Sequence, residues 1–280
     1  MHVICATAAR VLQTLVRGII GKEVRGVTSL DNLLYVLRRG TSSCHIEVYD
    51  KDSYCLQRKL TVRELGAADD IATCKHERCA YVSDSGNACV HRVALPAGAD
   101  VSSWPVNDKP VGISVVTDSH SVLVTCWLVG KIKEFSTDGQ PIRELQLSGD
   151  VPSPQHTIQL SSGQFMVCHG LPSDKFHRVG LLASDGQIVT SFGGSLGSGR
   201  QQMNVPRHLA VDKDGFVFVV DLNNRRVLLL SASLTYIREV VSRDQLKGKP
   251  YRLCLDEEKN RLYVAYNNFV NGGQVVVMSI

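Results

Sequence analysis

A short β-rich run recurs along the chain, and its spacing constrains the fold more than any other feature. Successive copies begin 46, 42, 43, 52 and 45 residues apart. Four copies are preceded, 12 or 13 residues upstream, by a proline that opens a stretch with apolar residues at alternate positions. The copies begin at Tyr35, Tyr81, Leu123, Met166, Phe218 and Tyr263, and the prolines are Pro110, Pro154, Pro206 and Pro250. A period of this length is typical of proteins built from repeated structural units.

Each unit contains enough short strands for one antiparallel sheet. The recurring run is followed by a third apolar run and usually by a fourth, and Asp-Gly pairs at Asp138 and Asp185 favour tight hairpins between them. No segment has a helical apolar periodicity of useful length. The pattern predicts an all-β chain, a six-bladed β-propeller of four-stranded antiparallel blades. The expected blades of this single domain, residues 1–280, span about 24–62, 63–106, 107–147, 148–194, 195–243 and 244–280.

The last unit lacks a fourth strand. It ends with the run QVVVMSI, which corresponds to the third strand of the other units. The N-terminal segment 10–20 resembles the outermost strands elsewhere and precedes the first strand of the first unit. We therefore expect residues 10–20 to complete the sixth blade, because an open ring would leave unpaired sheet edges at both ends.

The composition predicts which residue types fill the core and whether the protein resides in a reducing cellular compartment. Hydrophobic residues make up 44% of the 280 residues but aromatic ones only 6%, so the core must consist mainly of Val, Leu and Ile. Nine cysteines, an odd number, lie mostly within apolar runs, which predicts core thiols in a reducing compartment and no disulfide framework. The N-terminus has neither a signal-peptide pattern nor an apolar block of about 18 residues. We expect a cytoplasmic protein.

The fifth unit carries a family motif. Residues 203–230 read MNVPRHLAVDKDGFVFVVDLNNRRVLLL and resemble an NHL repeat: a proline, an aliphatic-Asp strand, an Asp-Gly turn, an aromatic-Val-Asp strand and then Asn-Arg-Val. Residues 250–280 are similar to a lesser degree, and the other units resemble the family in architecture alone. NHL propellers form the C-terminal domain of tripartite-motif ubiquitin ligases, where they recognise RNA or protein, and they also occur as sensors and as a lyase of peptide amidation.

This resemblance implies three alternative functions. The first is a non-enzymatic recognition module for protein or RNA. The second is the substrate-recognition part of a ubiquitin-ligase system; the chain has no CxxC-rich zinc array and no heptad run, so RING catalysis is not expected in this polypeptide. The third is a metal-dependent lyase related to the peptide-amidation lyase.

One rim of the expected propeller is rich in basic side chains. This rim is built from the loops between second and third strands and from the links between blades. The basic and aromatic residues that map to it are Arg38, Arg39, Trp127, Lys131, Lys175, Phe176, Arg200, Arg207 and Arg225. Such a set suits a single-stranded nucleic acid, because it neutralises phosphates and stacks on bases. A mixed, solvated loop surface is the alternative, and a net charge of +4 requires no anionic partner.

The Asn-Asn-Arg-Arg break of the fifth unit contains two arginines with different expected roles. Arg226 matches the arginine of the NHL pattern, and the resemblance implies a structural pair with Asp221, the carboxylate that ends the preceding strand. Arg225 should point the other way, because side chains alternate along an extended segment. We therefore expect Arg225 to be the contact residue of the two.

Three histidines bear on the lyase alternative. His156 and His208 each follow an opening proline by two residues, and His169 ends the second strand of the fourth unit. Together at the channel mouth they would suit a metal-dependent enzyme. The apolar alternation of the fourth unit is offset by one residue, however, which predicts that His156 turns away, and the sequence places no Tyr-Arg pair beside them. We expect no catalytic residue here.

A second group of soft ligands comprises Cys74, His76, Cys79, Cys89 and His91. Cys79 opens a strand, whereas Cys89 and His91 lie past its far end, roughly 17 Å away at about 3.3 Å per residue. We therefore expect no zinc site and no other cofactor.

The prediction from the sequence is a monomeric, non-enzymatic recognition module that binds a protein or a single-stranded RNA through one rim. Neither a membrane nor double-stranded DNA is expected as a partner.

Overall fold

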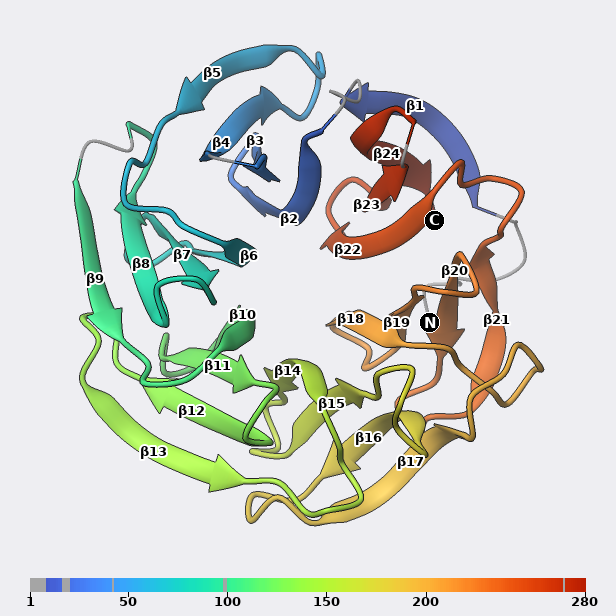
Figure 1. Ribbon diagram of the computed structural model, residues 1–280. Coiled ribbons are helices and arrows are strands. Elements are labelled where there is room, and N and C mark those ends of the chain that lie inside the picture. Colours follow the sequence, from blue (N-terminus) through green and yellow to red (C-terminus); the bar gives the residue numbers. More distant parts are fainter. Residues whose placement is uncertain (1–8, 17–20, 42, 98–99, 269) are drawn as a thin grey trace.

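The computed structural model describes residues 9–16, 21–41, 43–97, 100–268 and 270–280. Within them, 24 strands form six four-stranded antiparallel sheets, which stand as blades around a central axis (Figure 1). The described residues contain no helix that is long and apolar enough to span a membrane. The expected all-β, six-bladed β-propeller is confirmed.

In blades 1 to 5 the chain runs from the axis outward, one strand after another (Figure 1). The strands are β2 (Glu23–Leu30), β3 (Leu33–Arg39), β4 (Cys44–Asp50) and β5 (Leu56–Leu60) in blade 1; β6 (Ala68–Cys74), β7 (Cys79–Asp84), β8 (Cys89–Ala94) and β9 (Val101–Pro105) in blade 2; β10 (Pro110–Val115), β11 (Val122–Cys126), β12 (Lys131–Phe135) and β13 (Pro141–Gln146) in blade 3; β14 (Pro154–Gln159), β15 (Phe165–His169), β16 (His177–Leu182) and β17 (Ile188–Gly194) in blade 4; and β18 (Pro206–Val211), β19 (Val217–Asp221), β20 (Arg226–Leu230) and β21 (Tyr236–Val241) in blade 5.

Blade 6 closes the ring with strands from both ends of the chain. It contains β22 (Lys249–Asp256), β23 (Arg261–Asn268), β24 (Gly272–Ser279) and, outermost, β1 (Arg10–Val16). β1 is antiparallel to β24, with Arg10 opposite Ser279. The expected closure by the N-terminal strand is confirmed for residues 10–16; residues 17–20 of the expected strand lie outside the described residues.

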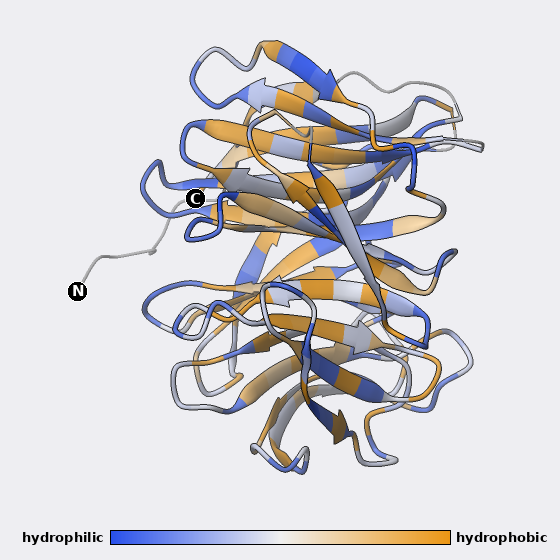
Figure 2. Cartoon of the chain, turned by 90° about the vertical axis from the view of Figure 1, so that its left-hand side faces the viewer, coloured by the Kyte–Doolittle hydropathy of each residue, from blue (hydrophilic) through white to orange (hydrophobic). Residues whose placement is uncertain are grey.

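Apolar residues on both faces of the blades form the core. Between blades 5 and 6, for example, Phe218 and Leu229 pack with Leu253 and Val264, and none of the four is more than 2% exposed. Figure 2 shows the apolar residues concentrated on the strands, whereas the loops are mostly polar. Because each blade buries its two faces against its neighbours, a single blade would leave apolar surface in water.

Each innermost strand has an irregular register near its start. The shift lies between Val24 and Gly26 in β2 and at the equivalent place in every other innermost strand. Two consecutive residues at this point therefore oppose one residue of the second strand, as in a β-bulge. The contacts described below show that side chains from both positions reach the axis. The bulges thus supply two layers of side chains at one end of the channel.

Blades 3 and 4 approach closely at this level. A Cβ atom on Gly112 would lie 2.5 Å from the carbonyl oxygen of Gln155 and 3.0 Å from the Cα of His156. Both atoms belong to backbone that cannot move independently. A glycine is therefore required at this position of β10.

Candidate functional site at the channel mouth

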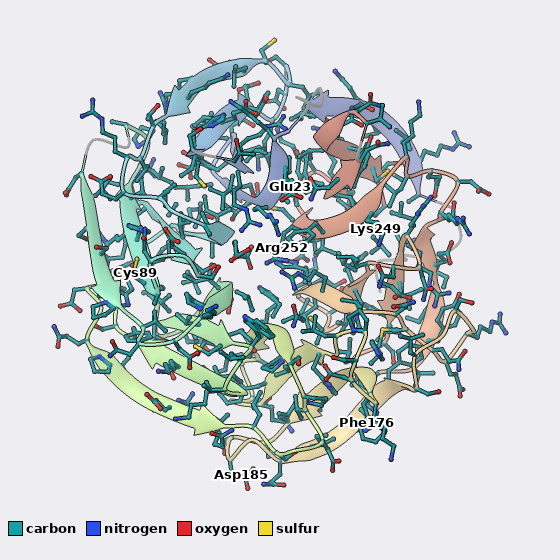
Figure 3. All side chains as sticks on the ribbon, in the orientation of Figure 1. Glu23, Cys89, Phe176, Asp185, Lys249 and Arg252 are labelled. Atoms are coloured by element: carbon teal, nitrogen blue, oxygen red, sulfur yellow. The ribbon has the colours of Figure 1, made fainter. Side chains whose placement is uncertain are left out.

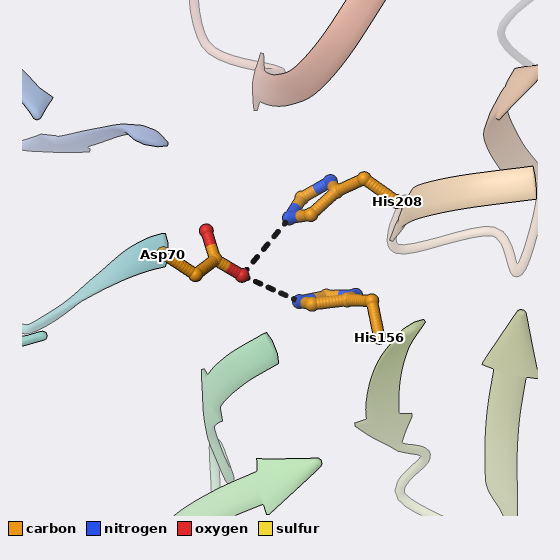
Figure 4. Close-up of side chains that lie close together, drawn as sticks. All are labelled: Asp70, His156 and His208. Carbon is orange, nitrogen blue, oxygen red and sulfur yellow. Dashed lines mark ion pairs between the residues drawn. The ribbon is translucent and has the colours of Figure 1, made fainter. Parts of the chain in front are cut away.

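The second residue of each bulge belongs to an inner layer of residues near the axis. Four of these residues, from four blades, contact one another: Asp70, His156, His208 and Arg252. Arg252 Nε lies 2.8 Å from Asp70 Oδ1, and the guanidinium also donates to the carbonyl of Val111 at 2.8 Å. Figure 3 shows Arg252 close to the axis. His156 Nε2 and His208 Nε2 each lie 3.8 Å from Asp70 Oδ2, and the two imidazole centroids are 3.9 Å apart (Figure 4). The sequence reasoning missed Asp70 and Arg252, although both occupy the position in their units that His156 and His208 occupy in theirs.

Burial sets the charge of these groups. At most 10% of any of the four side chains is exposed. Burial, together with the charge of Arg252, lowers the pKa of His156 to about 3. Burial, with His156 and Arg252 nearby, also lowers the pKa of His208 well below its usual value, so both imidazoles are neutral at physiological pH. Burial raises the pKa of Asp70, while the adjacent Arg252 opposes that shift.

The donor set of this layer resembles that of a metal site. Asp70, His156 and His208 each offer one ligand atom, and these atoms lie within 4.8 Å of one another. Imidazole and carboxylate ligands suit zinc and related cations. The buried guanidinium of Arg252, however, already pairs with Asp70 and repels a second cation at this distance. The layer therefore already contains a cation, which pairs with its one carboxylate.

One expectation about the histidines needs correction. His156 does not turn away from the axis, because the register shift between Pro154 and His156 returns its side chain to the channel side. His169, at the end of β15, is fully buried and does not join the cluster formed by the described residues. Burial lowers the pKa of His169 to about 4.

The outer layer consists of the residues that directly precede the inner ones. Tyr251 belongs to this layer, and both Arg25 and Arg207 donate to its hydroxyl oxygen. Their guanidinium carbons lie 4.9 and 4.7 Å from the centre of its ring. Arg207 also donates to Oε1 of Gln155. Arg207, expected as a rim contact, is thus held by neighbours at the channel mouth.

A pocket of about 480 Å³ opens beside the outer layer, where blade 6 meets blade 1. Figure 3 shows Glu23 and Lys249 near the starts of neighbouring innermost strands, close to Arg252. The basic side chains of the pocket are those of Lys22, Arg25, Arg39 and Lys249. Glu23 forms ion pairs with Arg25 and, at 3.7 Å, with Arg39. Of the nine rim candidates taken from the sequence, Arg39 is the one that lines this pocket.

Arg38 was expected on the rim, but it is buried. Its side chain is 1% exposed, with Nε 2.9 Å from Glu47 Oε2 and a second hydrogen bond to the carbonyl of Gly273. Side chains alternate along a strand, so Arg38 and Arg39 face opposite sides of β3. Arg39 reaches the rim, where it pairs with Asp69 at 3.0 Å, whereas Arg38 enters the interior between blades 1 and 6.

Other rim candidates lie on blades 3 and 4. Lys131 Nζ is 2.9 Å from Glu144 Oε2. Lys175 Nζ lies 5.0 Å from the ring centre of Phe176, and Arg178 approaches the same ring to 3.8 Å. These residues are not among those that line the pocket between blades 6 and 1.

In blade 5 the Asn-Asn-Arg-Arg break is a turn tied down by an ion pair. Arg226 Nε lies 2.8 Å from Asp221 Oδ2, and the guanidinium also donates to carbonyls of the link between blades 4 and 5. Arg225 closes the turn with a positive φ of 56°. Arg200 stands over the ring of Tyr236, with its guanidinium carbon 5.6 Å from the ring centre.

The same rim exposes apolar side chains that a search for charge does not find. Trp127, Leu128 and Val129 form the loop between β11 and β12, and Leu128 and Val129 are 61% and 42% exposed. Val270, in the corresponding loop of blade 6, is 72% exposed. Leu196, in the link between blades 4 and 5, is 45% exposed. The sequence signal for this exposed surface was a run of consecutive apolar residues in an expected loop, at positions 127–129.

The soft ligands of blade 2 separate into two places. Cys74 and Cys79 oppose each other at one end of the hairpin of β6 and β7. Cys89 pairs in register with Asp84 at the other end. His91 Nε2 lies 3.2 Å from both Cys89 Sγ and Asp84 Oδ2.

Asp84 ties the link between blades 1 and 2 to blade 2. Its carboxylate accepts hydrogen bonds from the backbone N–H groups of Gly66, at 2.6 Å, and Ala67, at 2.9 Å. Burial lowers the pKa of His91, but hydrogen bonds to Asp84 and Cys89 outweigh it and raise the pKa to about 9. The protonated imidazole pairs with the Asp84 carboxylate, and this pair forms an ionic latch.

These features define the class of the molecule: it is a six-bladed β-propeller protein with a buried ionic cluster near its axis and a basic pocket on one rim. No family model matches the sequence, and no curated protein matches it either.

Solved structures share the fold at low identity. The PQQ-bound aldose sugar dehydrogenase of Streptomyces coelicolor has a TM-score of 0.69 and 13% identity, over 97% of this chain and 98% of that one. Streptogramin B lyase has a TM-score of 0.67 and 11% identity, over 95% and 97%. A chain of the nidogen/laminin complex has a TM-score of 0.66 and 13% identity, over 84% and 85%. At such identities the likeness shows the fold alone.

Proposed function

We propose that the protein is a non-enzymatic recognition module that binds a partner protein through the rim that carries the pocket. The observation behind this proposal is the exposed loop of Trp127, Leu128 and Val129 on the same rim as a basic pocket. Protein interfaces combine aromatic and apolar anchors with a polar rim. The NHL-like residues 203–230 support the proposal, because that family is used for recognition. Recognition of a substrate for a ubiquitin-ligase system would be one case of it.

RNA is a less favoured ligand than protein. The ring of Phe176 is already approached by Lys175 and Arg178, and that of Tyr251 by Arg25 and Arg207. Stacking on single-stranded bases needs open aromatic faces next to basic groups. The lyase alternative has less support as well, because the guanidinium of Arg252 already pairs with the carboxylate that lies beside the two channel histidines.

A site-specific photo-crosslinker at position 128 tests the proposal in cells. Position 142 in β13 serves as the matched control, since Ile142 is 55% exposed but lies on the outermost strand of blade 3. We expect one or a few proteins to crosslink at position 128 and not at position 142. Recovery of RNA without protein at position 128, or the same proteins at both positions, would overturn it.

A further inference from the structure

We infer that the pocket between blades 6 and 1 binds carboxylate groups of an acidic segment of the partner protein. The inference rests on the proposed function and names the chemistry that this part of the rim recognises.

The pocket has an excess of positive charge. The basic side chains that line it are those of Lys22, Arg25, Arg39 and Lys249, and the one carboxylate among its described lining residues is that of Glu23. Asp69 does not line the pocket but pairs with Arg39, so the two carboxylates and four basic groups together leave a net charge of +2. Because the carboxylates pair with the two arginines, the excess belongs to the two lysines.

Three hydrogen-bond donors of the pocket have no anionic partner. The ammonium group of Lys22 forms no hydrogen bond or ion pair with a described residue. Lys249 Nζ contacts the neutral Oδ1 of Asn223 at 2.8 Å. The Tyr251 hydroxyl oxygen accepts two hydrogen bonds from arginines, and no described residue accepts its own proton. An entering carboxylate, which has two acceptor oxygens, satisfies such donors.

Glu23 shows which anion the pocket accommodates. Its carboxylate bridges Arg25 and Arg39 and is 48% exposed, so it lies at the edge of the pocket and not beneath it. A carboxylate from a partner would enter next to this group and would be repelled by it. Removal of the Glu23 charge should therefore strengthen binding of an acidic ligand, whereas removal of the lysine charges should weaken it.

The lining favours an acidic peptide over RNA. Among the described residues of the pocket, Tyr251 is the only aromatic one, and guanidinium groups already approach its ring. A volume of about 480 Å³ lies within the common range for ligand pockets and leaves room for short side chains together with their backbone.

Fluorescence anisotropy with a labelled octaglutamate peptide tests the inference on the full chain. Octaglutamine and an eight-nucleotide uridine RNA serve as comparison probes. The pocket variant is Lys22→Gln with Lys249→Gln, and a second variant is Glu23→Gln. The control is Lys131→Gln with Lys175→Gln, which also removes two positive charges, from blades 3 and 4 of the same rim. We expect the pocket variant to bind octaglutamate about tenfold more weakly, Glu23→Gln about threefold more tightly, and the control within about twofold of the native protein.

Equal weakening by the control, which removes the same number of charges, would overturn the inference, because binding would then follow overall charge. Tighter binding of the RNA than of octaglutamate, lost in the pocket variant, would overturn it in favour of phosphate. If octaglutamate binds no better than octaglutamine, the inference that the pocket binds carboxylates is refuted, but the proposed function is not. The crosslinks at position 128 would still report on the proposed function, so the two failures can be told apart.

Discussion

Two blades fasten the loop between their second and third strands with a buried carboxylate, and each uses a different cation. In blade 5, Asp221 pairs with Arg226, which lies opposite it in register. In blade 2, Cys89 occupies that opposite position, and His91 supplies the partner of Asp84. A cation that loses its charge as the pH rises therefore replaces one that is permanently charged.

This difference predicts a pH dependence of stability in blade 2. The folded pKa of His91, about 9, exceeds the unfolded value of about 6.5, so the contribution of its charge is complete below pH 6.5 and is lost as the pH rises through 9. Urea unfolding at pH 6 and pH 10 should show the advantage of the native protein over His91→Gln shrinking by about 2 to 3 kcal/mol. An advantage that is the same at both pH values would contradict the latch.

A second prediction at this scale concerns Gly112. Because a Cβ there would overlap the backbone of Gln155 and His156, we expect Gly112→Ala to lower the free energy of unfolding by about 1 to 3 kcal/mol. Gly149→Ala is the control, since no atom lies within 4 Å of a Cβ at that position. Equal denaturation midpoints for the two variants would show that blades 3 and 4 can separate at no cost.

At the scale of the strands, alternation and turn signals predicted most of the architecture, including the closing strand. The bulges in the innermost strands were not predictable in the same way. A shift of one residue moves a side chain to the other face of a strand, and nothing in the alternation of the fourth unit marks the place of the shift. That is why His156 was expected to turn away although it faces the axis.

The closing strand gives a prediction at the same scale. Deletion of residues 1–20 removes β1 and leaves the outer edge of β24 unpaired. We expect the melting temperature to fall by roughly 10 °C, as for a loss of several kcal/mol in a chain of this size. A synthetic peptide of residues 9–22 should restore part of the loss. An unchanged melting temperature would mean that β1 contributes little to blade 6.

At the scale of the whole molecule, the contact of Arg252 with Asp70 joins blades that are far apart in the sequence. The same guanidinium donates to backbone of blades 2 and 3. No local pattern pairs these residues, because each belongs to its own repeat and the ring brings them together across the axis. The repeat predicted which residues lie at this end of the propeller. It did not predict which residues form hydrogen bonds and ion pairs with them.

Removal of Arg252 tests how much this contact stabilises the ring. Arg252→Met leaves the Asp70 carboxylate buried without its cation, and we expect a loss of about 3 to 5 kcal/mol in the free energy of unfolding. The double variant Arg252→Met with Asp70→Asn should recover part of the loss. Calorimetry or urea unfolding measures both. If the double variant is no more stable than the single one, the guanidinium acts through packing and not through charge.

The pairing of β1 with β24 also determines how the molecule responds to force. Arg10 and Ser279 lie opposite each other in an antiparallel pair. Tension applied through these two residues therefore loads the hydrogen bonds of that pair one after another, as in the opening of a zipper, and does not shear them together. A pull on Arg10 and Ser279 is therefore expected to open the ring at this single seam, while the contacts between the other blades stay unloaded.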